Sequence, residues 1–346
     1  MIRPSLVFPA VFMTAAVLAQ ASNYGPFGCP TCGGGFDASA FNVVTLGTSS
    51  TLSTGNFNPT SDVGGGVAVF GSYTGNGYQI GSQTSSVPNP YTDNYAMIVN
   101  GSVSTNPFTV GNGGATSVWV GGTYGNSFSN QQQLTISQSP AALDFDFLAA
   151  RTSLDNLSSN TLTNYTSTAG TPVSNGTNYV LTAVGTGLLV YNINASYFTN
   201  QNLGFEVDLS TGQSVIVNIT GASSSFTFSK GTAVKYNGSQ VNANTTGGVP
   251  VLFNLPEVTT LSTSNGAING SILAPYASFS SNQNVDGQLF VASVTSLAET
   301  HDQYYNGLLP ANSLNQLAVA TPEPATLLLF GGALLAIGAV GRKNRR

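Results

Sequence analysis

The sequence predicts a mainly β protein with one amphipathic helix, and three observations lead to that prediction. Short runs of apolar or β-branched residues recur from residue 41 to 138, where glycine or Asn-Gly follows them, and again from 178 to 294. In the first region their centres lie roughly 20 to 30 residues apart, which suits the coils of a β-solenoid. One stretch between the two regions has a helical period. Short strands of this kind suit a β-sandwich equally well, so the pattern leaves both architectures open.

The first 21 residues have the pattern of a secretory signal peptide. Arg3 supplies the positive start, residues 6–18 are mostly apolar, and Ala19 and Ala21 give the small-residue pattern for cleavage before Ser22. A buried N-terminal helix is the alternative, and it is disfavoured because Asn, Gly, Pro and Cys follow immediately. The sequence therefore predicts an exported protein.

Residues 22–36 form a Gly/Pro-rich lead-in that holds both cysteines of the chain, Cys29 and Cys32. A C-x-x-C pair is typical of redox sites, metal sites and haem attachment points. Haem attachment requires a histidine where Gly33 stands, zinc requires two further ligands, and a run of glycines is a poor helix start for a redox motif. We therefore predict a local Cys29–Cys32 disulfide or a surface cross-link, as suits an oxidising compartment.

Three predicted strand runs precede the helix, at residues 64–73, 95–103 and 116–124. Ser139 is then placed to cap the helix and Pro140 to occupy its first turn. Apolar residues follow every three or four positions, at Leu143, Phe147, Ala150, Leu154 and Leu157. The helix is expected to pack this stripe against a β-core and to end within residues 158–166.

Strand runs return after the helix, at residues 178–185, 188–194, 204–210, 214–221, 249–257, 270–279 and 287–294. Because no Pro/Ser-rich linker divides the two β-regions, residues 37–308 are predicted to form one domain. Residues 309–321 then form a short tether to a C-terminal segment, residues 322–346.

The C-terminal segment begins with Pro322, Glu323 and Pro324 and ends in a basic cluster of Arg342, Lys343, Arg345 and Arg346. Between them, Ala325 to Gly341 is 17 residues without a charge. That stretch makes roughly 25 Å of helix, near the lower limit for crossing a bilayer. The basic cluster is expected to stay on the cytoplasmic side.

Charge is scarce along the chain, at 6% of residues against about a quarter in an average soluble protein. Between the two ends there are three basic residues, Arg151, Lys230 and Lys235, against twelve acids. Three scattered cations cannot neutralise a run of phosphates, which argues against nucleic acid as a partner.

Two small groups of residues are candidates for chemistry. His301, the single histidine, lies between Glu299 and Asp302, and one histidine without cysteine partners is a weak metal site. Glu206 and Asp208 lie two apart in a predicted strand and point to one face, as in a glycosidase pair or a calcium site. No basic residue lies near this pair in sequence, and no G-x-S-x-G, H-E-x-x-H or P-loop is present. We therefore predict that the chain is not an enzyme and uses no cofactor or metal.

Residues 251–301 resemble the C-terminal signature of choice-of-anchor A domains, an ice-binding-like adhesive family. The matching positions, to which the resemblance gives a structural role, are Asn254, Pro256, Glu257, Gly270, Leu273, Ala274, Pro275, Gly287, Glu299 and His301. Leu255 stands where the family more often has Phe. The resemblance implies a right-handed parallel β-solenoid with one long amphipathic helix packed alongside. The tail resembles a PEP-CTERM sorting signal, which implies a bacterial protein whose tail an exosortase recognises and removes.

The predicted function is that of a secreted, surface-attached adhesive or matrix protein in the envelope or extracellular matrix of a Gram-negative-type bacterium. Its predicted partners are the secretion machinery, an exosortase, the inner membrane transiently through the C-terminal helix, and an extracellular polysaccharide or other envelope polymer. One alternative is a carbohydrate-active β-helix enzyme acting through Glu206 and Asp208. Another is an ice-binding protein, for which residues 259–264 are suitably Thr-rich, but residues 271–278 and 287–294 do not repeat their pattern.

Overall fold

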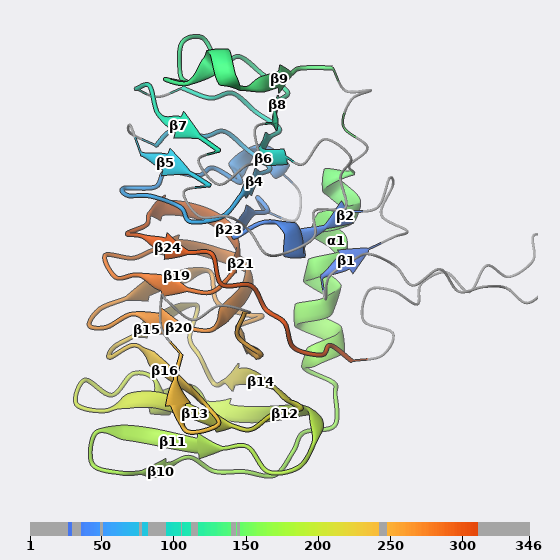
Figure 1. Cartoon of the computed structure of the whole chain (residues 1–346). Helices are drawn as coiled ribbons and strands as arrows, with labels where there is room; N and C mark the ends of the chain where they lie inside the picture. Colours follow the sequence, from blue (N-terminus) through green and yellow to red (C-terminus); the bar gives the residue numbers. More distant parts are fainter. Residues whose placement is uncertain are drawn as a thin grey trace, which may run out of the picture.

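The computed structural model describes residues 27–29, 36–48, 51–75, 78–81, 95–104, 106–111, 117–139, 143, 146–241 and 248–310. Within these residues the chain forms a stack of coils made mainly of parallel strands, with one helix beside it (Figure 1). The predicted signal peptide, Cys32, the tether beyond residue 310 and the C-terminal segment lie outside the described residues. Within the described part, no helix is long and apolar enough to cross a membrane.

The strands form two large sheets that run along the stack. The first has the order β12 (Gly187–Asn194), β14 (Gln213–Thr220), β18 (Val251–Asn254), β21 (Ser271–Ser280), β23 (Leu289–Ser296), β3 (Val43–Thr45), β4 (Val67–Val69), β6 (Tyr95–Val99), β8 (Ser117–Val120) and β9 (Thr135–Ser137), with β15 (Ser225–Phe228) and β19 (Thr260–Thr263) joined to β21. The second has the order β10 (Val173–Ser174), β11 (Asn178–Thr182), β13 (Gly204–Leu209), β16 (Thr232–Tyr236), β20 (Ile268–Asn269), β22 (Val285–Asp286) and β24 (Thr300–His301), with β17 (Ser239–Gln240) on β16.

Shorter elements complete the described fold. Two further strand pairs are β1 (Gly28–Cys29) with β2 (Phe36–Asp37) and β5 (Gln79–Ile80) with β7 (Thr109–Val110). The 3-10 turns are η1 (Ala38–Ala40), η2 (Leu52–Thr54), η3 (Gln131–Gln133) and η6 (Ala195–Tyr197). The parallel sheets and the helix confirm the mainly β part of the prediction, whereas the right-handed winding of the coils stays a prediction.

The spatial order of the coils differs from their order in the chain. β3 pairs in parallel with β23, with Val44 opposite Phe290, so the first strands of the chain continue the stack where its last strands end. At the end of the second sheet, Val63 likewise pairs with Thr300 of β24. We call this contact between the two halves of the chain the seam. The helix runs beside the stack and brings the chain to the end where β10 to β12 lie (Figure 1).

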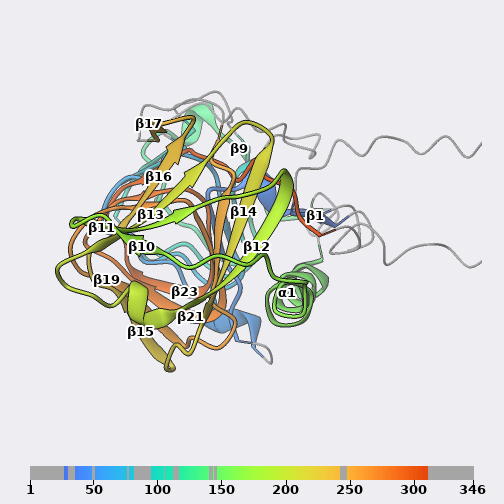
Figure 2. The ribbon, with the colours of Figure 1, turned by 90° about the horizontal axis from the view of Figure 1, so that it is seen from below.

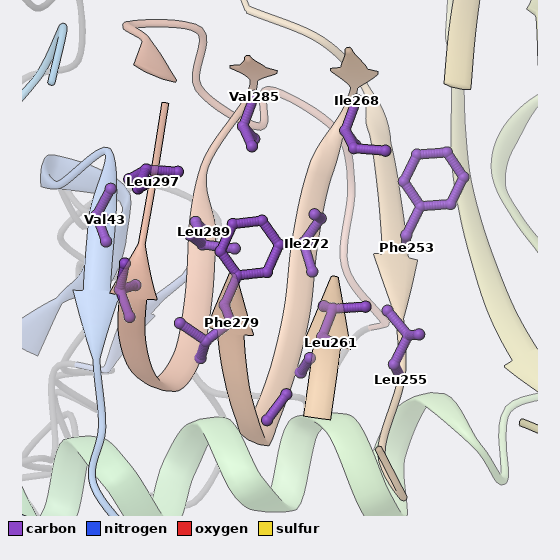
Figure 3. Close-up of a cluster of buried hydrophobic side chains, with 14 of the residues drawn as sticks. Val43, Phe253, Leu255, Leu261, Ile268, Ile272, Phe279, Val285, Leu289 and Leu297 are labelled. Atoms are coloured by element: carbon purple, nitrogen blue, oxygen red, sulfur yellow. The ribbon is translucent and has the colours of Figure 1, made fainter. Parts of the chain in front are cut away.

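Apolar side chains from every side of the coil fill its interior (Figure 3). Those labelled there are fully buried and include Val43, Phe253, Leu261, Ile268, Ile272, Phe279, Val285 and Leu289. In the first sheet the neighbouring residues point the other way, toward the helix, and they form a second apolar core with Val44, Ala68, Ile98, Leu273 and Phe290. Because both faces of these strands are buried, they appear in the sequence as continuous apolar runs.

The helix begins later than predicted. α1 (Phe147–Asn156) is continued by a π-helical turn, η5 (Leu157–Leu162). Asp146 is its cap, because the carboxylate accepts hydrogen bonds from the backbone N–H groups of Leu148 and Ala149, both at 2.9 Å. Ser139 is therefore not the cap, and its carbonyl instead accepts the indole N–H of Trp119 at 2.9 Å.

The predicted apolar stripe of the helix is confirmed. Ala150, Leu154 and Leu157 are fully buried in the second core, and Phe147 packs against its edge. The helix ends at Leu162, inside the predicted range.

A column of three asparagines holds the end of this helix against the first sheet. Asn192, Asn218 and Asn254 are register partners, and each of the latter two donates its amide to the previous one, at 3.0 and 2.9 Å. The same two amides donate to helix carbonyls, Asn218 to Leu162 (2.7 Å) and Asn254 to Ser158 (3.0 Å). Carbonyls near a helix end lack partners within the helix, so this asparagine column satisfies them.

Candidate functional site

The coil has three sides, and they differ in what they expose. α1 covers the first side, along β12 and β14, as the view along the stack shows (Figure 2). The second side, which holds β11, β13, β16, β20, β22 and β24, carries most of the charged residues in the described part of the coils. The third side is formed by β15, β19 and the second halves of β21 and β23, on a flank that the helix does not cover (Figure 2).

The third side repeats one three-residue pattern on seven successive coils: an apolar residue flanked by Ser, Thr or Asn. In spatial order the segments are residues 225–227, 260–262, 278–280, 293–295, 56–58, 72–74 and 102–104. Their central residues pair in parallel and are at most 3% exposed: Phe226, Leu261, Phe279, Val294, Phe57, Tyr73 and Val103. The flanking residues form two parallel lines on the outer surface, which we call the hydroxyl columns.

The hydroxyl columns are accessible to solvent and continuous across the seam. Every flanking residue is exposed or half-buried, and none is charged. The hydroxyl oxygens of Thr227 and Ser262 lie 2.8 Å apart on neighbouring coils. At the seam, Asn58 Nδ2 donates to the carbonyl of Thr295 at 3.3 Å. The two halves of the chain therefore present one uninterrupted polar surface.

Successive coils do not repeat a Thr-x-Thr motif, and what they share is the looser pattern of Ser, Thr or Asn on both sides of an apolar residue. β21 has a register shift between Ala274 and Ser278, so its first part belongs to the helix side and its second part to the third side. The repeat lies in that second part and in the second part of β23, of which residues 271–278 and 287–294 include only the beginning. Another shift places Ser296 opposite Ser280, so Thr295 bulges from the strand.

On the second side, Glu206 is buried between two partners. Lys235 Nζ lies 2.8 Å from Glu206 Oε1, and Asn178 Nδ2 donates to Glu206 Oε2 at 3.1 Å. Parallel pairing places Lys235 opposite Asp208 on the next strand, although the two are distant in sequence. Strand register therefore supplies the Glu206/Asp208 pair with a cation that does not lie near it in sequence.

This charged cluster resembles a cross-strand link more than a reaction site. Burial, reinforced by the Glu206 carboxylate, raises the pKa of Asp208, and the hydrogen bond with Glu206 raises the pKa of Lys235. Two carboxyls with different environments can act as acid and base. Here both Glu206 oxygens are already engaged by protein donors.

A hollow in the described surface is lined by Ser129, Asn130, Gln132 and Gln133. It lies at the opposite end of the stack from the Glu206 cluster, so the two do not form one site.

His301 belongs to a second network on the same side, next to the seam. Its Nδ1 lies 2.5 Å from Asp286 Oδ1 on the neighbouring strand, and its Nε2 lies 3.5 Å from Glu299 Oε1. Asn269 donates to the other Asp286 oxygen at 2.8 Å. Strand register thus brings Asp286 to His301 as its close carboxylate partner. The sequence neighbour Glu299 supplies a second carboxylate at a greater distance. Within the described residues, no group of three or more His, Cys, Asp or Glu is arranged to hold a metal ion.

The His301 network predicts a stability that falls as the pH rises. The hydrogen bond with Asp286 raises the pKa of His301, and the charges of Asp286 and Glu299 act in the same direction against burial. The contribution of His301 to the stability of the fold is therefore complete below about pH 6.5, the ordinary pKa of histidine. It is lost as the pH rises through the higher pKa of His301 in the folded state. Urea unfolding midpoints across this range should show that loss. His301→Gln should remove it, and an unchanged pH profile in this variant would contradict the assignment.

A family model for ice-binding-like adhesive domains matches residues 37–302, more than half of the chain. The chain belongs to that family. A model for the PEP-CTERM protein-sorting motif matches residues 320–346, so the two resemblances drawn from the sequence are confirmed. No curated protein and no solved structure matches. The adhesive domain and the sorting motif support export to the cell surface, the motif implies processing by an exosortase, and the family suggests a non-enzymatic role.

Several motif residues of this adhesive domain lie where the chain bends or meets the helix. Asn254 ends the asparagine column, and Ala274 and Pro275 are buried at the bend of β21. A Cβ on Gly287 would lie 2.3 Å from the carbonyl oxygen of Gly270, so only glycine fits where these two coils cross. Of the remaining motif residues outside the His301 network, Leu273 is fully buried beneath the helix, Pro256 is half-buried and Glu257 is exposed.

Proposed function

We propose that this protein is a secreted, surface-attached bacterial adhesive protein whose hydroxyl columns bind glycans or another extracellular polymer. The observation that carries the proposal is the third side, where uncharged Ser, Thr and Asn residues repeat in register over seven coils. The family and the sorting motif support its place at the cell surface. Within this proposal the coils wind right-handedly, and residues 37–308 act as one rigid body in a Gram-negative-type envelope or matrix.

Binding on such a surface depends on the number of contacts. A single hydrogen bond contributes only about 0.5–1.5 kcal/mol net, because each group exchanges water for its new partner. Adhesion then requires many coils to contact the same polymer. Since the flanking residues carry no charge, salt is expected to have little effect on the affinity.

Removing hydroxyls from the columns is expected to weaken adhesion. The double variant Thr74→Leu/Thr260→Leu replaces two exposed hydroxyls with side chains that hold a polymer off the surface, and retention should fall at least tenfold. The matched control is Thr152→Leu/Thr182→Leu, which changes two exposed threonines on α1 and on the second side. Retention is measured on immobilised extracellular polysaccharide and on cells that lack the protein. Equal loss in both variants, or no retention of the unchanged protein, would contradict the proposal.

An ice-binding role is a second candidate, favoured by hydroxyls that repeat at the spacing of parallel strands, about 4.8 Å. Such a regular array can order water as well as bind a polymer. Thermal hysteresis of the purified protein, lost in Thr74→Leu/Thr260→Leu, would support it. If the protein solution freezes as buffer does, the ice-binding role is ruled out and polymer binding is the remaining proposal.

We also propose that the C-terminal segment anchors the protein only until an exosortase cleaves it. The mature protein is then expected to lack Arg342 to Arg346. Intact-mass measurement of protein isolated from the envelope tests this, and a mass that includes the basic cluster would instead make the segment a permanent anchor.

A further inference from the structure

We infer that the ligand of the hydroxyl columns is a neutral, extended polymer that lies along the stack and crosses the seam. This inference rests on the proposed function, and it adds the chemistry, direction and minimum length of the ligand. The columns run from coil to coil, because the central residues pair in parallel from one coil to the next and carry their flanking residues with them, with a bulge at Thr295. A chain lying along them meets a new pair of polar groups about every 4.8 Å.

The dimensions of the surface set the length of the ligand. Seven coils make six intervals of about 4.8 Å, so each column is about 29 Å long. The two columns are separated by two residues along each strand, about 6.6 Å, which is room for one extended chain. Four of the seven coils come from the second half of the sequence and three from the first. A ligand of full length therefore contacts both halves.

The hydroxyl columns form an open, extended binding surface and not a pocket. The apolar central residues of the pattern are buried, so they cannot form apolar walls around a single sugar. Only the flanking polar side chains reach the surface. Short oligomers should then bind weakly, since each coil contributes little. The affinity should rise with every added unit until the chain exceeds about 29 Å.

The charge distribution selects the class of polymer. The columns hold no acid and no base, whereas Glu206, Asp208, Asp286 and Glu299 lie on the second side with Lys235 as the paired cation. An anionic polymer gains no ion pair on the third side, yet it loses hydration of its own charges on contact. A neutral, hydroxyl-rich polymer loses less hydration free energy on contact.

A length series on the protein purified from the cell envelope tests this inference. The probes are linear, neutral β-linked glucose oligomers of increasing length and anionic uronic-acid oligomers of the same lengths. We expect affinity for the neutral series to rise at least a hundredfold and then level off at an extended length of about 29 Å. Affinity for the anionic series should stay at least tenfold lower. Affinity that is independent of length, or higher for the anionic series, would overturn the inference.

Two single substitutions locate the ligand along the columns. Thr295→Leu obstructs the fourth coil of the series and leaves three coils on each side, whereas Ser104→Leu obstructs the last and leaves six. Both positions are exposed. In Thr295→Leu, the affinity should rise much less with oligomer length than in the unchanged protein. In Ser104→Leu, the affinity should level off at an oligomer one unit shorter. Equal effects would contradict a ligand that crosses the seam.

Retention on the native extracellular polymer, measured with the same preparations, keeps the two proposals distinguishable. Retention without the predicted length dependence overturns the inference and leaves the proposed function in place. If the protein is not retained on the native polymer, both the proposed function and the inference are overturned.

Discussion

Replacing Arg151 with methionine is expected to lower the free energy of unfolding by about 3–5 kcal/mol. The Arg151 side chain is 1% exposed beneath the helix. Its Nε donates to Asp155 Oδ2 at 2.8 Å, a second nitrogen donates to the carbonyl of Gly47, and its guanidinium lies 5.2 Å from the centre of the Tyr276 ring. Methionine retains most of the volume but leaves the Asp155 carboxylate without its cation. Burial already raises the pKa of Asp155 despite Arg151, so the unpaired carboxylate is costly.

The position of Arg151 makes this loss global. Gly47 follows β3 in the first half of the chain, and Tyr276 belongs to β21 in the second half, so one side chain on the helix contacts both sides of the seam. The two halves are also joined by strand pairing, by apolar packing and by neutral side-chain hydrogen bonds such as those of Asn42 and Gln288. Weakening this contact should therefore destabilise the whole stack.

Urea unfolding provides the measurement for Arg151→Met. Thr152→Ala, at an exposed position beside it, is the control and should change stability by less than about 0.5 kcal/mol. The double variant Arg151→Met/Asp155→Asn should recover part of the loss, because no buried charge remains. A loss below about 1 kcal/mol for the single variant would show that the buried pair contributes little.

The local elements of this fold could be predicted from the sequence. Each predicted strand run overlaps an observed strand, because apolar alternation and turn residues act within a few positions, although β15 and β16 lie outside the predicted runs. The stripe of Ala150, Leu154 and Leu157 likewise located the helix. Its start was mispredicted, because Ser139 and Pro140 also suit a cap, and Asp146, equally able to cap, lies seven residues later.

The long-range arrangement could not be predicted in the same way. The pairing of β23 with β3 joins opposite ends of the domain, and no local signal in either strand specifies its partner. Lys235 meets Glu206 only through the register of β13 and β16. The hydroxyl columns depend on the same information, since their segments are scattered through the sequence in an order unlike their order in space. Once register is known, the recurring triplets are evident.

Replacing Asn254 with leucine is expected to lower the free energy of unfolding by about 2–4 kcal/mol. Asn254 is fully buried, and its amide donates to the carbonyl of Ser158 and to Asn218 Oδ1, while its own oxygen accepts from the Ser158 hydroxyl at 2.6 Å. Leucine fills a similar space but leaves these buried groups without partners, each at a cost of about 1–3 kcal/mol. The matched control is Asn192→Leu at the exposed end of the same column, where the loss should stay below about 1 kcal/mol.

Asn254→Asp separates the loss of the amide donors from the loss of shape. The carboxylate keeps the size of the amide but faces the Ser158 carbonyl and Asn218 Oδ1 with oxygens alone, so at neutral pH this variant should be at least as unstable as Asn254→Leu. Burial and these acceptors raise the pKa of the new carboxyl above the ordinary value of about 3.9, and the neutral acid regains one donor. Relative to the unchanged protein, its stability should therefore increase as the pH falls through that raised pKa. A stability difference that does not vary with pH would show that the asparagine column acts through packing and not through its donors.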